Sequence, residues 1–195
     1  MRIIAGAARG RTLAAPSHGT RPTSDRVRES MFSTLQSMLT GEGRSWSGLH
    51  VIDGYAGSGA LGLEALSRGA VSVVLVEKRA QCAEVIRRNA ERVGLPGTRV
   101  VVGTVRSLAR RAPGGPPADL VLLDPPYDVP SATIAQELGE LHSAGWLASG
   151  AIVVVERPAG QAQSPMPWPG ARRDYGDTAL WYGRVTDGRE ERDDA

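Results

Sequence analysis

Four consecutive residues could form a site for a flat ligand that carries an amino group. Asp124-Pro125-Pro126-Tyr127 directly follows the apolar run 119–123, so the four residues lie where a buried strand meets its loop. Two prolines fix φ and remove two backbone donors, which leaves a rigid turn. The Tyr127 ring can stack on a planar group, while the Asp124 carboxylate and a carbonyl oxygen accept its two amino hydrogens. An ordinary strand-end turn uses prolines in the same way, so a second feature is needed.

That second feature is a glycine-rich loop upstream. An apolar strand from about Leu49 runs into Gly57-x-Gly59-x-x-Gly62, and a helical pattern follows. These glycines let a backbone approach a ligand at a helix N-terminus. Glu77 ends the next apolar run, at the spacing of an acid that binds ribose hydroxyls. The pattern predicts a cofactor that contains a nucleoside.

Asp53 indicates which cofactor this is. The residue ends its strand just ahead of the glycines. A carboxylate there repels a pyrophosphate and attracts an ammonium group, such as the one on the methionine end of S-adenosylmethionine. The sequence therefore predicts an S-adenosylmethionine site, with the Asp124 turn further along the same sheet edge.

Alternating strands and helices must position these residues. Strands are expected at 49–53, 71–77, 99–102, 119–124 and 151–156, and helices at 61–68, 79–93, 105–110 and 132–144. A final antiparallel hairpin is expected from strands at 172–175 and 179–185. The expected fold class is α/β, with a doubly wound, mostly parallel, seven-stranded Rossmann-like sheet.

A small N-terminal extension precedes this sheet. A β-hairpin is expected at residues 2–13. A helix is expected at residues 25–39, with Ser24 as its N-cap. The expected organisation is this extension over residues 1–45, a catalytic domain over 46–186 and an acidic tail over 187–195.

Charge distribution suggests a nucleic-acid partner at the N-terminal end. The net charge is only +2, but no acid occurs before Asp25, and Lys78 is the sole lysine. Arginine suits phosphates and base edges because its guanidinium is a planar fork. The candidates for RNA contact are Arg2, Arg9, Arg11, Arg21, Arg26 and Arg28.

Composition is that of an ordinary globular chain of 195 residues, with 41% hydrophobic and 23% charged residues. No apolar run approaches a membrane span, and no signal peptide is apparent. The single cysteine fits a reducing cytoplasm, and the three scattered histidines lack metal-ligand spacing. We expect a cytoplasmic monomer without a metal or a membrane partner.

Taken in order, these motifs resemble the RsmD-like RNA methyltransferases, which methylate the exocyclic N2 of one guanine in 16S ribosomal RNA. The resemblance covers nearly the whole chain. Its motifs are Arg2 to Gly6, Arg9 to Arg11, Arg21 to Thr23, Arg26 to Glu29, Asp53 to Gly62, Glu77-Lys78, Asp124 to Tyr127 and Tyr175 to Leu180. The chain departs from the family at Gly54-Tyr55, where Leu-Phe is usual, and at Gly103 to Val105, which lacks the acid that many such enzymes use near the adenine.

The resemblance implies the sheet of S-adenosylmethionine-dependent methyltransferases, with residues 1–45 as an RNA-binding extension and 46–186 as the methyltransferase domain. It also implies a role for each motif. Asp124, Pro125, Pro126 and Tyr127 form the catalytic turn. The cofactor-binding residues are Asp53, Gly54, Ala56, Gly57, Gly59, Glu77, Lys78, Thr104 and Val105. Thr23 closes over the cofactor or the flipped base. The implied partner is 16S rRNA within a 30S subunit or an assembly intermediate.

Two alternatives remain open from the sequence. An amino-methyltransferase acting on DNA adenine or protein glutamine shares the Asp-Pro-Pro-Tyr motif, although it needs a target-recognition region and only about 45 residues precede the sheet. A non-catalytic RNA-binding assembly factor could keep the same fold. Loss of Asp124, Tyr127 or Glu77 would favour that reading, and all three are present.

Overall fold

The structure is a computed structural model that describes residues 1–16 and 25–187. Arg21, Thr23, the Ser24 cap and the tail beyond Asp187 lie outside the described residues. In the described part, no helix is both long enough and apolar enough to cross a membrane.

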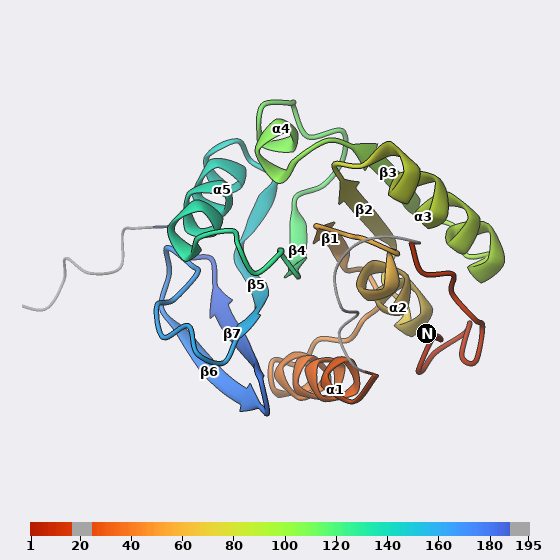
Figure 1. Ribbon diagram of the computed structural model, residues 1–195, viewed down its shortest axis with the longest axis horizontal. Helices are drawn as coiled ribbons and strands as arrows, with labels where there is room; N and C mark the ends of the chain where they lie inside the picture. The colour runs from red at the N-terminus through yellow and green to blue at the C-terminus, as the bar shows by residue number, and fades with distance from the viewer. Residues whose placement is uncertain (17–24, 188–195) are drawn as a thin grey trace, which may run out of the picture.

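A seven-stranded sheet forms the centre of the molecule (Figure 1). Its strands are β1 (His50–Gly54), β2 (Ser72–Glu77), β3 (Thr98–Val102), β4 (Ala118–Leu123), β5 (Leu147–Pro158), β6 (Gly170–Tyr175) and β7 (Thr178–Arg184). The spatial order is β3-β2-β1-β4-β5-β7-β6, with β1 to β5 parallel and β7 antiparallel to both β5 and β6. The expected fold class, including the terminal antiparallel hairpin, is confirmed.

Helices cover both faces of the sheet. They are α1 (Asp25–Gly41), α2 (Ala60–Arg68), α3 (Ala80–Val93), α4 (Val105–Ala109) and α5 (Ser131–Ser143). Figure 1 shows α1, α2 and α3 on one side and α4 and α5 on the other. The order in which successive strands join the sheet reverses between β1 and β4, which are themselves parallel. Open α/β sheets bind ligands at the carboxyl ends of the strands beside such a switch point.

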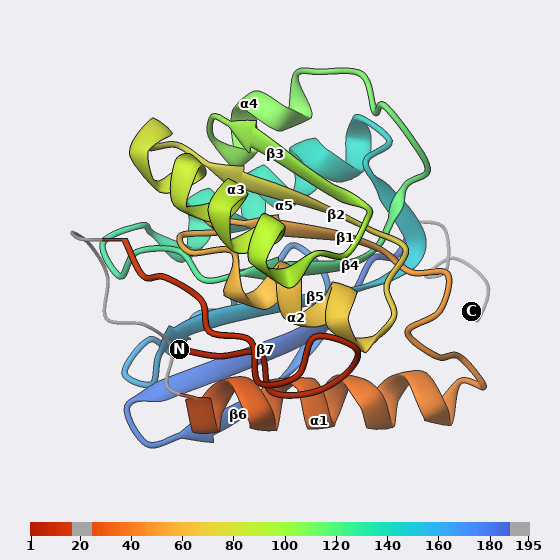
Figure 2. The ribbon, with the colours of Figure 1, turned by 90° about the vertical axis from the view of Figure 1, so that its right-hand side faces the viewer.

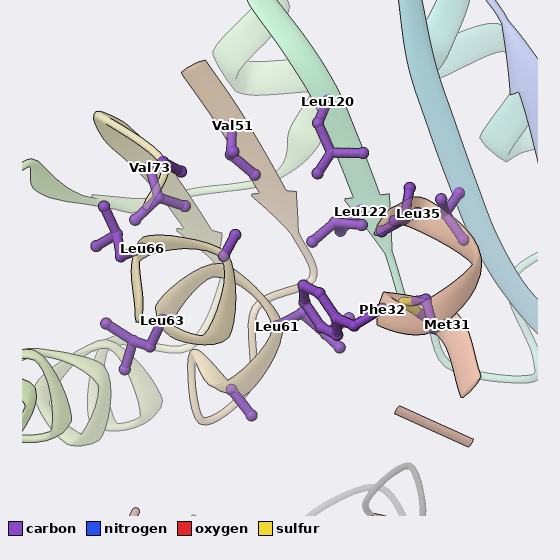
Figure 3. Close-up of a cluster of buried hydrophobic side chains, with 14 of the residues drawn as sticks. Met31, Phe32, Leu35, Val51, Leu61, Leu63, Leu66, Val73, Leu120 and Leu122 are labelled. Atoms are coloured by element: carbon purple, nitrogen blue, oxygen red, sulfur yellow. The ribbon is translucent and has the colours of Figure 1, made fainter. Parts of the chain in front are cut away.

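Side chains that alternate along the strands divide the core into two layers. Leu120 and Leu122 face the layer under α1 and α2, whereas Val121 and Leu123 face the layer under α5. Figure 3 shows Phe32 of α1 among side chains of the first layer. Each such fully buried side chain contributes about 1.5–3 kcal/mol, so α1 belongs to the main core.

The first sixteen residues are tied to α2 and α3 (Figure 2). Glu64 of α2 accepts hydrogen bonds from the backbone N–H groups of Ile4 and Ala5. The expected hairpin is reduced to one antiparallel bridge, between Arg2 and Thr12. The chain bends at Gly6, where its backbone passes close to α2. Only glycine fits there, because a Cβ on Gly6 would lie 1.7 Å from the Ser67 carbonyl oxygen.

Candidate active site

Three carboxylates gather at the carboxyl ends of neighbouring parallel strands. Asp53 lies near the end of β1, Glu77 ends β2, and Asp124 follows β4. They line two adjoining pockets. The Asp53 pocket, of about 190 Å³, contains Asp53 and Asp124, and the Glu77 pocket, of about 440 Å³, contains Glu77 and Asp124. The two pockets share Tyr55, Gly57, Arg79 and Asp124, so they are two parts of one site.

Asp53 is a buried acid that is held in place from one side. Its side chain is 1% exposed, and one carboxylate oxygen accepts a hydrogen bond from the Gly62 N–H at 2.8 Å. Burial raises the pKa of Asp53 to about 7, and the nearby Asp124 and Glu77 carboxylates raise it further against the opposing effect of the Gly62 bond. A cationic group in this pocket would offset the cost of ionising Asp53.

The loop after β1 divides into residues that line the pockets and residues that pack behind them. Ala56 and Gly57 line the Asp53 pocket, and Gly57 has a φ of 57°. Gly54 and Gly59 do not appear among the residues lining either pocket. A Cβ on Gly54 would lie 2.5 Å from Leu123, and one on Gly59 would lie 3.1 Å from Ile86. These two glycines therefore permit close packing, and a direct contact of either with the cofactor stays a prediction.

The Glu77 pocket brings together the residues expected around the nucleoside. Lys78, Thr104 and Val105 line it with Glu77. The Glu77 side chain is 5% exposed and accepts hydrogen bonds from the backbone N–H groups of Gly57 at 3.0 Å and Arg79 at 2.9 Å. These bonds fix the carboxylate at the edge where a ribose would lie.

An interaction absent from the sequence-based expectations also lies in this pocket. The Tyr55 hydroxyl donates to Glu137 of α5 at 2.5 Å. Tyr55 is the one non-glycine residue with a positive φ, 63°, in the described part of the chain. Burial raises the pKa of the Glu137 carboxyl, and the bond from Tyr55 opposes that rise. This contact gives a structural role to Tyr55, which stands where the family usually has Phe.

The Asp124 turn is held from behind by a buried arginine. Pro125 is buried, Pro126 lines the Glu77 pocket, and Tyr127 is 54% exposed. Arg157 of β5 is fully buried and points its guanidinium at carbonyl oxygens of the turn, with distances of 3.4 Å to Pro126 and 2.7 Å to Val129.

The predicted RNA-contact arginines fall into different environments. Arg2, Arg9 and Arg26 are exposed. Arg11 donates from Nη1 to the carbonyl oxygens of Arg92 and Val93, both at 2.6 Å, and so caps the C-terminus of α3.

Arg28 differs from the other candidates for RNA contact. Only 1% of it is exposed, and it lines the Asp53 pocket. It lies on the helix face that packs on the core, so a contact of Arg28 with RNA stays a prediction.

Four further residues of the site were not predicted from the sequence, namely Tyr55, Arg79, Glu137 and Arg157. One signal was available for Arg157, because Glu156-Arg157 follows an apolar strand as Asp53, Glu77 and Asp124 do. No local pattern points to Glu137, which is one polar residue among several on α5.

The charged and polar residues of the site fit S-adenosylmethionine. A buried carboxylate with a raised pKa stands where an ammonium group would lie, and a second acid stands beside the ribose edge. A third acid, Asp124, borders both pockets, where a methyl donor and an amino-bearing target would meet. The fold and the site together define an S-adenosylmethionine-dependent methyltransferase.

Comparison with known proteins gives the family. Residues 1–184 match the family described as Conserved hypothetical protein 95. The chain is 37% identical over 157 residues to ribosomal RNA small subunit methyltransferase D of Escherichia coli strain K12, covering 80% of this chain and 74% of that protein. The same-named protein of Haemophilus influenzae is 35% identical over 159 residues, covering 80% and 78%. The chain belongs to the ribosomal RNA small subunit methyltransferase D family, and the resemblance found in the sequence is confirmed.

Solved structures agree with this assignment. A putative methyltransferase, yhhF, from Escherichia coli has a TM-score of 0.79 and 32% identity, covering 95% of this chain and 98% of that one. An RNA methyltransferase from Salinibacter ruber in complex with S-adenosyl-L-homocysteine has a TM-score of 0.62 at 17% identity, covering 90% of this chain and 100% of that one, and shows the shared fold.

Proposed function

We propose that this protein transfers a methyl group from S-adenosylmethionine to the exocyclic N2 of a guanine in 16S ribosomal RNA. The observation that carries the proposal is the position of Asp124, which borders both the Asp53 pocket and the Glu77 pocket. Relatives of similar length bear the name ribosomal RNA small subunit methyltransferase D.

The bound cofactor supplies an electrophilic methyl group on a sulfonium. Asp53 binds the methionine ammonium, and Glu77 accepts hydrogen bonds from the ribose. Ala56 and Gly57 border the methionine part, while Thr104 and Val105 flank the adenine. The positions of these residues in the lining of the two pockets support the assignments.

The Asp124 turn prepares the target amino group. The guanine amino nitrogen is a weak nucleophile because its lone pair is delocalised into the ring. Asp124 and the Pro125 carbonyl accept both amino hydrogens, which favours a tetrahedral nitrogen and stabilises the positive charge that develops as the bond to the methyl carbon forms. Tyr127 stacks on the base after it leaves the RNA helix. The proton leaves the nitrogen after transfer, so no base is required beforehand, and positioning supplies much of the acceleration.

The exposed arginines Arg2, Arg9 and Arg26 provide contacts for the RNA backbone. We further propose that the substrate is a 30S subunit or an assembly intermediate, and that the protein acts as a monomer in the cytoplasm.

Incubation with radiolabelled S-adenosylmethionine tests the proposal. The substrates to compare are 30S subunits that lack the modification, naked 16S rRNA, DNA and protein, and mass spectrometry of RNase digests identifies the product. N2-methylguanine in 16S rRNA with wild-type protein, and none with Asp124→Ala, is the expected result. Transfer to DNA or protein, or normal transfer by Asp124→Ala, would contradict the proposal.

A further inference from the structure

Arg28 places a buried cation in the Asp53 pocket. The side chain extends from the first turns of α1 and lines the pocket together with Asp53 and Asp124. Its Nη2 donates to the Arg2 carbonyl oxygen at 2.5 Å and to an Asp25 carboxylate oxygen at 3.0 Å. Its Nε has no hydrogen-bond partner among the described residues.

The local acids compensate this charge only in part. The Asp25 side chain is 59% exposed, so water weakens its attraction to Arg28. Glu64 is buried nearby, but its oxygens already accept bonds from Ile4, Ala5 and Arg68. Burial lowers the pKa of the Arg28 guanidinium against the attraction of Asp25 and Glu64. A buried guanidinium with an unused donor is costly, and an anion bound in the pocket would offset that cost.

The methionine end of the cofactor has the matching charges. It carries one ammonium and one carboxylate on the same carbon atom. The Asp53 pocket contains one buried acid and one buried base, each 1% exposed. We propose that Arg28 binds the carboxylate of the methionine part of S-adenosylmethionine while Asp53 binds its ammonium. Arg28 is then a cofactor-binding residue, and its neighbour Arg26, which is exposed, remains available to RNA.

Binding without RNA tests this assignment. The proposal rests on the S-adenosylmethionine site and not on the RNA target, so the experiment measures cofactor affinity by calorimetry in the absence of any methyl acceptor. The two ligands are S-adenosylmethionine and decarboxylated S-adenosylmethionine, which keeps the ammonium but lacks the carboxylate. Wild-type protein should prefer the first by roughly 10-fold or more, the gain expected of a buried charge-assisted hydrogen bond.

Variants separate this role from a structural one. Arg28→Met should reduce the preference between the two ligands to within about 3-fold, Arg28→Lys should restore part of it, and Arg26→Met should leave it intact. Equal affinity of wild-type protein for both ligands would overturn the proposal, and this measurement needs no variant that might fail to fold. Equal weakening of both ligands by Arg28→Met would instead assign Arg28 to scaffolding. If Arg28→Met keeps the preference for S-adenosylmethionine over its decarboxylated form but raises the KM for RNA, Arg28 would instead be assigned to binding of the target base.

Discussion

Arg157 donates a hydrogen bond from Nη2 to the carbonyl oxygen of Val129 at 2.7 Å, which joins the end of β5 to the loop that follows the Asp124 turn. The same guanidinium reaches the Pro126 carbonyl oxygen at 3.4 Å, and its Nε donates to Gln161 at 2.7 Å. Burial lowers the pKa of Arg157, while nearby Tyr55 and Asp124 oppose that shift. One side chain therefore holds the backbone of the Asp124 turn and places a positive charge near Asp124.

Replacing Arg157 should reduce turnover more than cofactor binding. Arg157→Met leaves buried carbonyl oxygens without a donor, so we expect the free energy of unfolding to fall by about 1–3 kcal/mol. A less rigid turn should lower kcat by roughly 10- to 100-fold while the Kd for S-adenosylmethionine changes by less than about 3-fold. Thermal melting, single-turnover kinetics and calorimetry measure the three effects. Arg88→Met, at an exposed position on α3, is the matched control for stability. Unchanged kcat in Arg157→Met would rule out the positioning role.

Asp53→Asn should stabilise the fold at pH 8 while it weakens cofactor binding. The folded-state pKa of Asp53 is about 7, above its ordinary value of 3.8, so the folded protein holds a proton that the unfolded chain releases between these values. Wild-type stability therefore falls as pH rises from about 4 to 7 and then levels off. Asparagine keeps an acceptor for Gly62 and avoids this loss, which amounts to at most roughly 4 kcal/mol.

Thermal melting of wild type and Asp53→Asn at pH 5 and pH 8 measures the effect. The variant should melt higher at pH 8, and the difference should shrink at pH 5. A variant that melts lower at pH 8 would contradict a raised pKa at Asp53.

Cofactor affinity should rise with pH for the same reason. Binding of an ammonium group requires the ionised form of Asp53, and a pKa of about 7 leaves only about one tenth of it ionised at pH 6. S-adenosylhomocysteine is a suitable ligand because its amino group stays protonated over this range. We expect roughly 10-fold tighter binding at pH 8 than at pH 6, measured by calorimetry, and no such trend in Asp53→Asn. A flat profile in wild-type protein would show that Asp53 does not titrate here.

The contributions of Tyr55 and Glu137 to the free energy of unfolding should be strongly coupled. Tyr55→Phe removes the hydroxyl that donates to Glu137, and the Glu137 side chain is only 7% exposed. We therefore expect the free energy of unfolding to fall by about 1–3 kcal/mol. The same substitution made on top of Glu137→Leu should cost much less. A double-mutant cycle by urea denaturation should give a coupling energy of at least about 1 kcal/mol. Additive effects would mean that the bond is not formed in solution.

Two arginines of the N-terminal segment should respond differently to substitution. Arg9 is exposed, so Arg9→Gln should weaken RNA binding, reduce the salt slope of log K by about 1 and leave melting unchanged. Arg11 caps α3, so Arg11→Gln should lower the melting temperature and have little effect on RNA affinity. Filter binding across a salt series, together with thermal melting, separates the two. If both variants change RNA affinity and melting temperature to the same extent, Arg9 and Arg11 do not have the separate roles expected here.

The order of apolar and polar residues along the chain is enough to predict the sheet and the acids at its edge. Apolar runs alternate with helical periods, which predicts parallel strands, and parallel strands bring their carboxyl ends to one side. Asp53, Glu77 and Asp124 each end or follow such a run, so their grouping around shared pockets follows from local pattern and topology alone.

The polar side chains that support those acids come from distant parts of the chain and meet only in the folded protein. Tyr55 and Glu137 are 82 residues apart, and Arg11 meets the end of α3 at a similar separation, so no local spacing encodes these contacts. Arg28 and Arg26 are two residues apart on one helix, yet the first is buried in the site and the second is exposed. The face of α1 that packs on the sheet determines the surroundings of these two side chains, and the surroundings of a side chain determine its charge state and its possible partners.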